Sequence, residues 1–466
     1  MAARAGGLMQ TRKDLYQAHR LTTQRIALAL LQGSPSAADS PLRRTGVGTL
    51  FGVMVVVLIA AGFGIAGLIF KGGARNLERP GTIVIEKETG ATYAYSAETR
   101  ELVPFLNYAS ARLAMTTPDI QRKLVSAKSL KKYARGPLTG IPAALESLPD
   151  PNDLAHAPWS LCVRRTGEDA TVSLIGGRDV GGTPLAEDRG LLVGSDSQSW
   201  LIWHNTRMKI SSRAARVLSP QAPVPVDPHW LNGLPQGPDF VAPTIPERGA
   251  NVPGPDGAPI HAGQVFHVQA IAGTPERWYV QLSDGLSNIS ATQARLLLDV
   301  PGAAPPRDIS PAAAASRPSK TNLYSRDLPE SPPGIAGYDS RQPLCTVYRD
   351  TDRLSSGARF TIGGTLPATI PTAAGLDQVV IPGGGTFVGT LPATGQPPES
   401  FSLITDQGTR YPISTSDDIS KLGYATNQAV PVPTNLLALF EEGPTLTAAA
   451  ARRPVPANDS PVATSP

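Results

Sequence analysis

Residues 45–70 have the sequence TGVGTLFGVMVVVLIAAGFGIAGLIF, which holds 26 positions in a row without a charged side chain. A helix rises about 1.5 Å per residue, so this stretch exceeds the ~30 Å hydrocarbon layer of a membrane. A helix in a soluble core rarely stays uncharged for so many turns. The apolar part of a signal peptide is shorter and lies nearer the N-terminus. The stretch therefore predicts one uncleaved transmembrane helix.

Basic residues on the two sides of this span predict its orientation. Residues 1–44 hold seven Lys/Arg and two Asp, a net charge of +5, and end in Arg43 and Arg44 at the membrane face. Beyond the span, Lys71 and the basic residues after it are soon met by acidic residues. Under the positive-inside rule, we expect residues 1–44 in the cytoplasm and the chain from about residue 71 outside it.

Two glycine patterns lie within the span. Gly48 and Gly52 form a G-x-x-x-G pair, which lets two membrane helices approach closely. Small residues are common in such helices without any contact, so a plain lipid-facing helix is the alternative. Residues 62–67 match the dinucleotide fingerprint G-x-G-x-x-G, but they lack the strand and βαβ context that this fingerprint needs. They do not predict a nucleotide site.

The arm before the span predicts an amphipathic helix over residues 11–32. Thr11 and Asp14 resemble a capping box, and apolar residues form a stripe with basic edges. Such a helix can rest on anionic lipid or dock on a cytoplasmic partner. The sequence does not separate these two roles.

The rest of the chain has the composition of a turn-rich folded domain. Of its 466 residues 45 are Gly and 46 are Pro, whereas 17% are charged and 41% hydrophobic. These values favour a largely β protein with some linker. The whole chain has a net charge of +4, so the residues after the arm sum to −1. Basic charge confined to the arm reflects membrane topology and does not indicate nucleic-acid binding.

Internal similarity predicts repeated modules beyond the membrane. A unit made of an apolar strand, an acidic or glycine turn and a second strand occurs four times. Each copy has the turn chemistry of a β-hairpin. The copies lie at residues 83–93, 192–203, 278–286 and 403–411.

A second pattern, Leu-x-x-apolar-x-x-Gly-Pro, follows three of the four hairpins at identical spacing. It places two apolar residues on one face of a short helix, and we expect its Gly-Pro pair to stop that helix. The three copies begin at Leu130, Leu231 and Leu437. The hairpin at 278–286 lacks the pattern, so we expect four related modules, one of them shortened.

Two matching segments predict a central β domain built from two halves. Each half begins with a strand that carries one of the two cysteines of the chain, Cys162 and Cys345. Their equivalent positions, on the side of the membrane where oxidation is permitted, favour a disulfide. A loop of about 180 residues would then be closed, which stabilises a fold by at most ~4–5 kcal/mol in the chain-entropy model. Two unrelated buried thiols are the alternative.

The predicted fold is α+β and β-rich, with a single transmembrane helix followed by an elongated extracytoplasmic domain of pseudo-symmetric repeat modules around a central β domain. The predicted order is a cytoplasmic basic arm with an amphipathic helix (1–44), the transmembrane helix (45–70), module 1 (71–150), the first half of the central β domain (151–190), module 2 (191–250), module 3 (251–300), a Pro/Ala-rich linker (301–343), the second half of the central domain (344–395), module 4 (396–450) and a flexible tail (451–466).

The sequence carries no motif of a familiar enzyme or metal site. It lacks the G-x-x-x-x-G-K-[ST] of phosphate-binding loops, the H-E-x-x-H of zinc proteases and the G-x-S-x-G of hydrolases. Its six His residues have no metal-ligand spacing. We therefore predict no catalytic, cofactor or metal residue, and a role in assembly instead of catalysis.

Several stretches together point to a known family. They are residues 41–44 (PLRR), 81–91 (GTIVIEKETGA), 102–113 (LVPFLNYASARL), 159–162 (WSLC), 231–238 (LNGLPQGP) and 422–424 (LGY). In this order, and spread over nearly the whole chain, they resemble EccB, a core membrane component of the type VII (ESX) secretion system of actinobacteria. The block NYASARL is the most specific of them.

The resemblance implies a periplasmic domain of repeats and a disulfide that falls on Cys162 and Cys345. It also implies self-association and a place in an inner-membrane complex with EccC (the motor ATPase), EccD, EccE and the mycosin protease. The implied function is a structural subunit that forms and stabilises a secretion channel. Family members are also labelled nucleotide hydrolases, which remains the alternative although no motif here supports it. Binding of an envelope polymer by the repeats is a third hypothesis.

Overall fold

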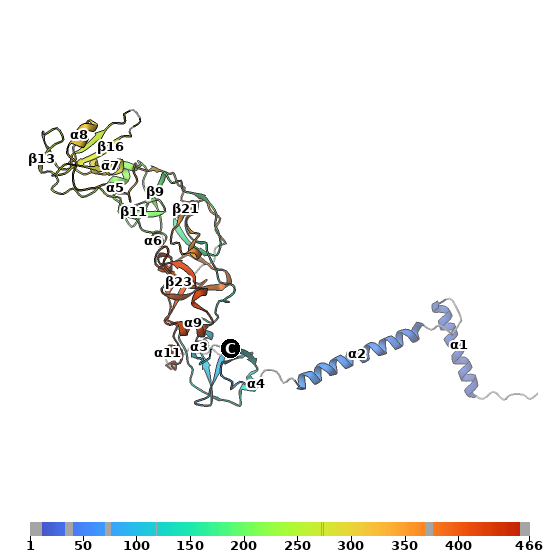
Figure 1. Ribbon diagram of the computed structural model, residues 1–466. Coiled ribbons are helices and arrows are strands. Elements are labelled where there is room, and N and C mark those ends of the chain that lie inside the picture. Colours follow the sequence, from blue (N-terminus) through green and yellow to red (C-terminus); the bar gives the residue numbers. More distant parts are fainter. Residues whose placement is uncertain are drawn as a thin grey trace, which may run out of the picture. The chain divides into compact units, whose positions relative to one another are not determined.

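The computed structural model describes residues 12–32, 41–69, 76–117, 119–271, 273, 275–368 and 376–456. It divides the chain into two units, Met1–Arg75 and Asn76–Pro466. The first unit contains two helices, α1 (Arg12–Gln32) and α2 (Pro41–Ile69) (Figure 1).

Helix α2 contains residues 45–69 of the predicted transmembrane stretch, and Phe70 lies outside the described residues. Its segment Val47–Ile65 has a mean hydropathy of 2.3 and is long and apolar enough to cross a membrane. Side chains along this segment are exposed, which suits a helix whose surroundings are lipid. Helix α1 begins one residue after the predicted start. Thr11, the predicted capping residue, lies outside the described residues.

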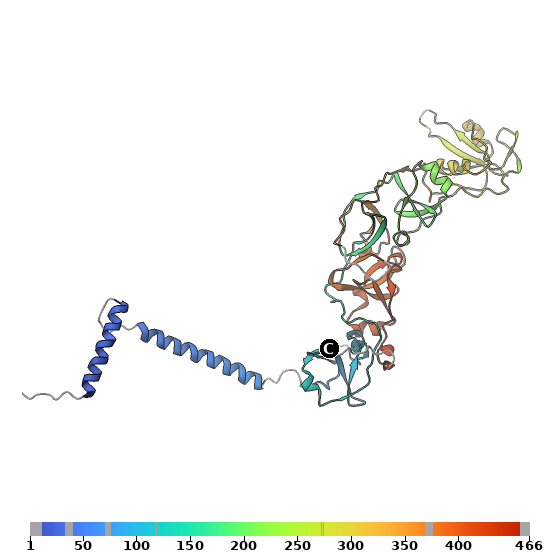
Figure 2. The same cartoon turned by 180° about the vertical axis from the view of Figure 1, so that it is seen from behind.

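Four copies of one motif build most of the second unit (Figures 1 and 2). Each copy is a three-stranded antiparallel meander, a helix, a strand parallel to the first strand, and a short helix. The chain then returns beside the third strand. The first copy consists of β1 (Thr82–Glu86), β2 (Thr92–Ser96), β3 (Glu101–Phe105), α3 (Tyr108–Ala114), β4 (Gln121–Val125), α4 (Ala127–Leu130) and β5 (Ala134–Arg135).

The other three copies repeat this order of elements. The second has β9 (Arg189–Ser195), β10 (Gln198–Trp203), β11 (Thr206–Ile210), α5 (Ser212–Leu218), β12 (Val224–Pro225) and α6 (Pro228–Asn232). The third has β15 (Val265–Val268), β16 (Arg277–Gln281), β17 (Leu286–Ile289), α7 (Ala291–Leu298), β18 (Arg307–Asp308) and α8 (Pro311–Ser316). The fourth has β23 (Gly385–Leu391), β24 (Phe401–Thr405), β25 (Thr409–Ile413), α9 (Ser416–Leu422), β26 (Val430–Pro433), α10 (Thr434–Leu437) and β27 (Glu441–Glu442).

The first helix of every copy begins with the same capping interaction. Asn107, Ser211, Ser290 and Thr415 each accept a hydrogen bond from the backbone N–H three residues later. This bond satisfies one of the free N–H groups at a helix start, and such a cap contributes about 1 kcal/mol. A short polar residue after the third strand therefore turns the chain into a helix in all four copies.

All four predicted hairpins are confirmed as antiparallel strand pairs. The third copy, however, is not shortened. After α7 the chain forms β18 beside β15, then α8, and Pro318 bridges to Leu286 on the third strand. The segment 301–343, expected to be a linker, thus completes the third copy, and β19 (Gly334–Ile335) pairs with β9.

The Gly-Pro pairs differ from the prediction because they do not stop helices. Gly136, Gly237 and Gly443 lie several residues beyond the short helices, where the chain runs beside the third strand of each copy. A Cβ atom on Gly443 would lie 2.7 Å from the ring of Tyr411. One on Gly237 would lie 2.7 Å from Thr206 Oγ1. Glycine is needed there for close approach of two backbone segments.

A six-stranded sheet forms the centre of the second unit. Its order is β22-β7-β6-β20-β21-β8, so the two predicted halves pair at the centre through β6 and β20, and each half also adds an edge strand to the other, β22 beside β7 and β8 beside β21. The strands are β6 (Trp159–Thr166), β7 (Asp169–Gly176), β8 (Thr183–Pro184), β20 (Leu344–Tyr348), β21 (Arg359–Ile362) and β22 (Gln378–Val380). The strand β23, predicted within the second half of this domain, belongs instead to the fourth copy.

One large apolar core joins the central sheet to its neighbours. It includes Trp159 and Leu344 of the central sheet, Trp230 of the second copy, Phe387 of the fourth and Leu113 of the first. The third copy has an apolar core of its own. The remaining short elements are β13 (Asn251–Pro253), β14 (Pro259–His261), α11 (Ala448–Ala451) and the 3-10 turns η1 (Thr351–Arg353), η2 (Pro382–Gly384) and η3 (Thr426–Gln428).

The first and last copies pack side by side although they are far apart in the sequence (Figures 1 and 2). Arg112 on α3 donates to the backbone oxygen of Lys421 at 2.9 Å. Arg452, just after α11, donates to the backbone oxygen of Ala114 at 3.2 Å. The segment after residue 451, predicted to be flexible, is hydrogen-bonded to the first copy at Val455, and residues 457–466 lie outside the described residues.

Candidate functional site

The two cysteines lie at the seam between the halves of the central sheet. Cys162 on β6 and Cys345 on β20 are direct cross-strand neighbours, with Cα atoms 4.0 Å apart. Their sulfur atoms are 2.09 Å apart, in a disulfide between residues separated by 183 positions. Both side chains are fully buried, against Ile175 and Val347. The bond therefore ties the two sequence halves together where their strands meet.

A polar junction connects the central sheet with the second and fourth copies. The buried hydroxyl of Tyr348, at the end of β20, donates to the backbone oxygen of Gly233 at 2.8 Å. The side-chain amide of Asn435, on α10, donates to that same oxygen and to the Tyr348 hydroxyl. Burial raises the pKa of Tyr348 well above its ordinary value, so the hydroxyl remains a neutral donor.

Close packing reinforces this junction. A Cβ atom on Gly233 would lie 2.2 Å from Leu161 of the central sheet and 2.8 Å from Leu439 of the fourth copy. The indole N–H of Trp230 donates to the backbone oxygen of Leu161 at 3.1 Å. The central sheet, the second copy and the fourth copy are thus fixed to one another by polar and apolar contacts.

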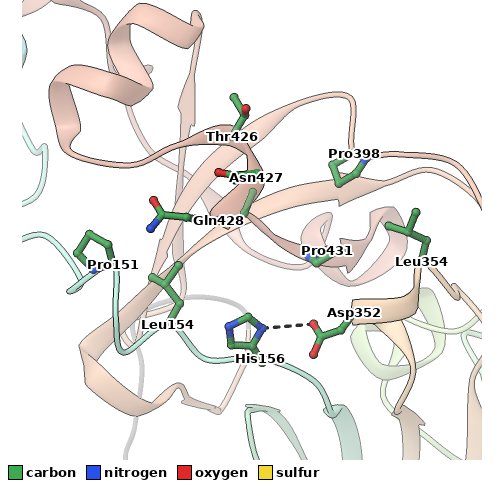
Figure 3. A pocket seen from close by; sticks show the side chains of 11 residues that line it. Pro151, Leu154, His156, Asp352, Leu354, Pro398, Thr426, Asn427, Gln428 and Pro431 are labelled. Carbon is green, nitrogen blue, oxygen red and sulfur yellow. Dashed lines mark ion pairs between the residues drawn. The ribbon is translucent and has the colours of Figure 1, made fainter.

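A surface hollow lies beside the central sheet, where the fourth copy packs on it (Figure 3). Its volume is about 530 Å³, and its walls include Leu154, Gln428 and Pro431. His156 and Asp352 lie next to each other in its wall, with 3.5 Å between Nδ1 and Oδ1 (Figure 3). Both side chains are substantially exposed, at 61% and 43%. One exposed His–Asp pair in an open hollow supplies no activated nucleophile, so this geometry does not by itself make an active site.

Three further histidines bond to nearby groups, among them His229, whose Nδ1 lies 3.0 Å from Asp227 Oδ1. His267 lies between Asp308, 2.9 Å away, and Glu276, 3.2 Å away. His261 Nδ1 lies 3.0 Å from the backbone oxygen of Gly249. Within the described ranges, His, Cys, Asp and Glu side chains form no group of three or more that could hold a metal ion.

The residues predicted around the membrane are placed only in part. Gly48 and Gly52 lie on α2, and no atom lies within 4 Å of the Cβ position of either. Arg43 and Arg44 belong to the same helix, but their side chains are not described, and Lys71 lies outside the described residues. The pair Gly48 and Gly52 therefore presents an open surface within the single chain.

Comparison with known proteins decides the family. The chain matches the family model for "Type VII secretion system ESX-1, transport TM domain B", which is EccB, over residues 8–456. The chain belongs to the EccB family.

EccB proteins of mycobacteria are similar to this chain over nearly their whole length. The chain is 29% identical to the "ESX-3 secretion system ATPase EccB3" of Mycolicibacterium smegmatis, an alignment that covers 94% of this chain and 90% of the relative. It is 28% identical to the "ESX-2 secretion system ATPase EccB2" of Mycobacterium tuberculosis, over 95% of each chain.

Solved structures of ESX complexes contain chains with the fold described above. A chain of "Structure of an intact ESX-5 inner membrane complex" matches 99% of this chain and 98% of its own length, with a TM-score of 0.63 at 24% identity. "Structure of EccB3 dimer from the ESX-3 core complex" matches 80% of this chain and 99% of its own length, with a TM-score of 0.62 at 27% identity. The predicted fold class, α+β and strand-rich with a single apolar helix before a large β-rich domain, is confirmed.

Sequence patterns missed the Tyr348 junction and the four helix caps. The caps carry a signal, a short polar residue directly before each helix, but Ser, Thr and Asn are too common in loops for single positions to stand out. The junction carries no local signal, because Tyr348, Gly233 and Asn435 come from three segments more than eighty residues apart.

Proposed function

We propose that this EccB protein is a structural subunit of an ESX inner-membrane complex, in which its outer unit forms and stabilises part of the secretion channel. The observation that carries the proposal is the seam at Cys162 and Cys345. A buried disulfide and the Tyr348 junction hold a central sheet between repeated modules, which is the construction of a scaffold. Solved relatives with the same fold belong to an ESX-5 inner-membrane complex and to an EccB3 dimer.

The partners follow from membership in such a complex. We propose EccC, EccD, EccE and the mycosin protease as neighbours, together with a second copy of this chain. The basic arm with α1 would lie in the cytoplasm, and the outer unit in the periplasm, because Arg43 and Arg44 flank the span on the arm side. No cofactor is required for this role.

Affinity purification of the tagged full chain from gently solubilised membranes tests the proposal. We expect the FtsK/SpoIIIE-like ATPase EccC and the other membrane components to co-purify in constant ratio. A variant with Gly48→Ile and Gly52→Ile separates the role of α2 from that of the outer unit, because bulky side chains block close helix contact. Recovery of this chain without any of these components would contradict the proposal.

Nucleotide hydrolysis is the second candidate function, because curated relatives carry the word ATPase in their names. The hollow at His156 is where we would test it first, since it contains a His–Asp pair among polar and apolar walls. Hydrolysis measured on the purified full chain would support this function only if Asp352→Asn removes it. Activity that is unchanged in Asp352→Asn would indicate either a contaminant or a different site.

A further inference from the structure

The first copy is tied closely to the membrane by the covalent chain. Helix α2 ends at Ile69 and the second unit begins at Asn76. Seven peptide steps reach at most ~25 Å. If α2 spans the membrane, some part of the first copy must therefore lie within this distance of the end of that helix.

A basic stretch belongs to this copy. Residues 121–135 hold six Lys/Arg and no acidic residue. They are Arg122, Lys123, Lys128, Lys131, Lys132 and Arg135. The fold brings them near the start of the unit, because Lys123 Nζ donates to the backbone oxygen of Asn76 at 3.2 Å. This closeness could not be predicted from the sequence, because more than fifty residues separate the basic stretch from the predicted span.

Tyrosines share a sheet face with this stretch. Ala94 on β2 packs with Ala111 of α3, so Tyr93 and Tyr95, its neighbours on the strand, project from the opposite face. The segment after α4 crosses that opposite face. Tyr133 contacts Tyr95 with ring centroids 6.0 Å apart, and the guanidinium of Arg135 lies 4.2 Å from the ring centre of Tyr93. We call this surface the tyrosine face.

Cations of the tyrosine face are not neutralised by the chain itself. Lys128, Lys131, Lys132 and Arg135 are exposed, and no ion pair found among the described residues involves them. The nearby acids have other bonds. Glu86 accepts from the Tyr93 hydroxyl at 3.0 Å and from Thr89, and Glu88 accepts from the backbone N–H of Ala127 at 2.9 Å. Glu101 lies beside the end of this stretch, in register with Ala134, and takes part in no ion pair found among the described residues.

We propose that the tyrosine face of the first copy binds anionic lipid headgroups on the membrane surface from which α2 emerges. Lysine and arginine attract lipid phosphates, and tyrosine rings favour the headgroup layer because one end is apolar and the other polar. Each basic residue near an anionic surface adds to the attraction, which decays within a Debye length. The covalent chain keeps part of the first copy within ~25 Å of the end of α2, and contact with the headgroups would bring the face within the shorter range of this attraction. This contact rests on insertion of α2 in a membrane and does not require a secretion complex.

Lysine acetylation of the full chain in lipid nanodiscs tests the proposal. One set of discs contains phosphatidylcholine alone, and the other includes phosphatidylglycerol. We expect Lys128, Lys131 and Lys132 to react about fivefold more slowly in the anionic discs. Lys209, an exposed residue on β11 of the second copy, is the internal control and should react equally in both.

Charge reversal provides a matched comparison. Lys131→Glu with Lys132→Glu should restore the reactivity of Lys128 in anionic discs. Lys209→Glu with Arg216→Glu, the same charge change on the second copy, should leave the protection intact. Added salt should weaken the protection, because it screens charges at a surface.

Three outcomes would overturn the proposal. Equal reactivity of the three lysines in both kinds of disc would show that lipid charge is not recognised. Protection that is equally strong in phosphatidylcholine would show that the face is covered for another reason. Protection that appears only after cell extract is added, and not with defined lipid, would assign the face to a protein or polymer partner.

Discussion

At the scale of single residues, the cysteines show what equivalent positions can reveal. Each cysteine lies on one of two matching strands, and this match is visible in the sequence alone. The structure adds that Cys162 and Cys345 are direct cross-strand neighbours in a fully buried place. Their bond limits the unfolded chain to conformations in which two distant segments stay together.

Replacing both cysteines by serine should lower the free energy of unfolding by about 2–4 kcal/mol. The reason is the lost constraint on a loop of 183 residues. Denaturant unfolding of the full chain in detergent measures the change. Reductant should destabilise the unmutated protein to a similar extent and leave the double variant unchanged. An unmutated protein that is insensitive to reductant would show that the bond does not form.

Asp179 gives a prediction about pH. Hydrogen bonds from the Gly181 N–H and from Arg349 hold the pKa of Asp179 below its ordinary value. A carboxyl with a lowered folded pKa stabilises the fold above the ordinary Asp value of about 3.9, and this contribution is lost as pH falls through the folded pKa. The effect is small because Asp179 and Arg349 are both partly exposed, so solvent screens the pair.

The stability advantage of the unmutated protein over Asp179→Asn should therefore be largest near neutral pH and shrink in acid. Unfolding curves recorded over a pH series measure this difference. Arg349→Gln removes the cation and keeps the carboxyl. This variant should therefore lose part of the stability that Asp179→Asn loses near neutral pH. A difference that grows as the pH falls would contradict the assigned direction of the pKa shift.

At the scale of elements, the turn residues made the four hairpins predictable from the sequence. The sequence did not predict that the third copy has all the elements of the other copies. In the first, second and fourth copies a glycine stands where the last segment runs beside the third strand. In the third copy, Ser319 stands at this place. Its close approach lies at Gly285 instead, where φ is +152° and a Cβ atom would be 2.4 Å from the backbone oxygen of Arg317. A search for one fixed Gly-Pro pattern therefore could not find this copy.

Alanine at the close-approach glycines should destabilise the protein. Gly237→Ala and Gly443→Ala would each place a methyl group against atoms at 2.7 Å, and overpacking of this kind costs about 1–3 kcal/mol. Gly337→Ala is the matched control, because its Cβ position is open. We expect this control to change stability by no more than about 0.5 kcal/mol in denaturant unfolding. Equal effects at all three positions would refute the role assigned to these glycines.

At the scale of the whole molecule, the sequence predicted an N-terminal arm, the apolar helix and a strand-rich second unit. It could not predict how copies from distant positions pack, because contacts such as Arg112 with Lys421 join residues about 300 positions apart. Such contacts are decided by the shapes of folded modules and not by local pattern. The proposed role depends on this scale, since a scaffold acts through its assembled form.

Native mass determination of the tagged protein, purified in gentle detergent with its neighbours identified, tests the central claim most directly. Our account predicts an assembly much heavier than the 48.8 kDa chain, holding more than one copy of this protein together with an FtsK/SpoIIIE-like ATPase. A stable single chain in every gentle preparation would contradict the scaffold and leave the nucleotide hydrolase as the better candidate.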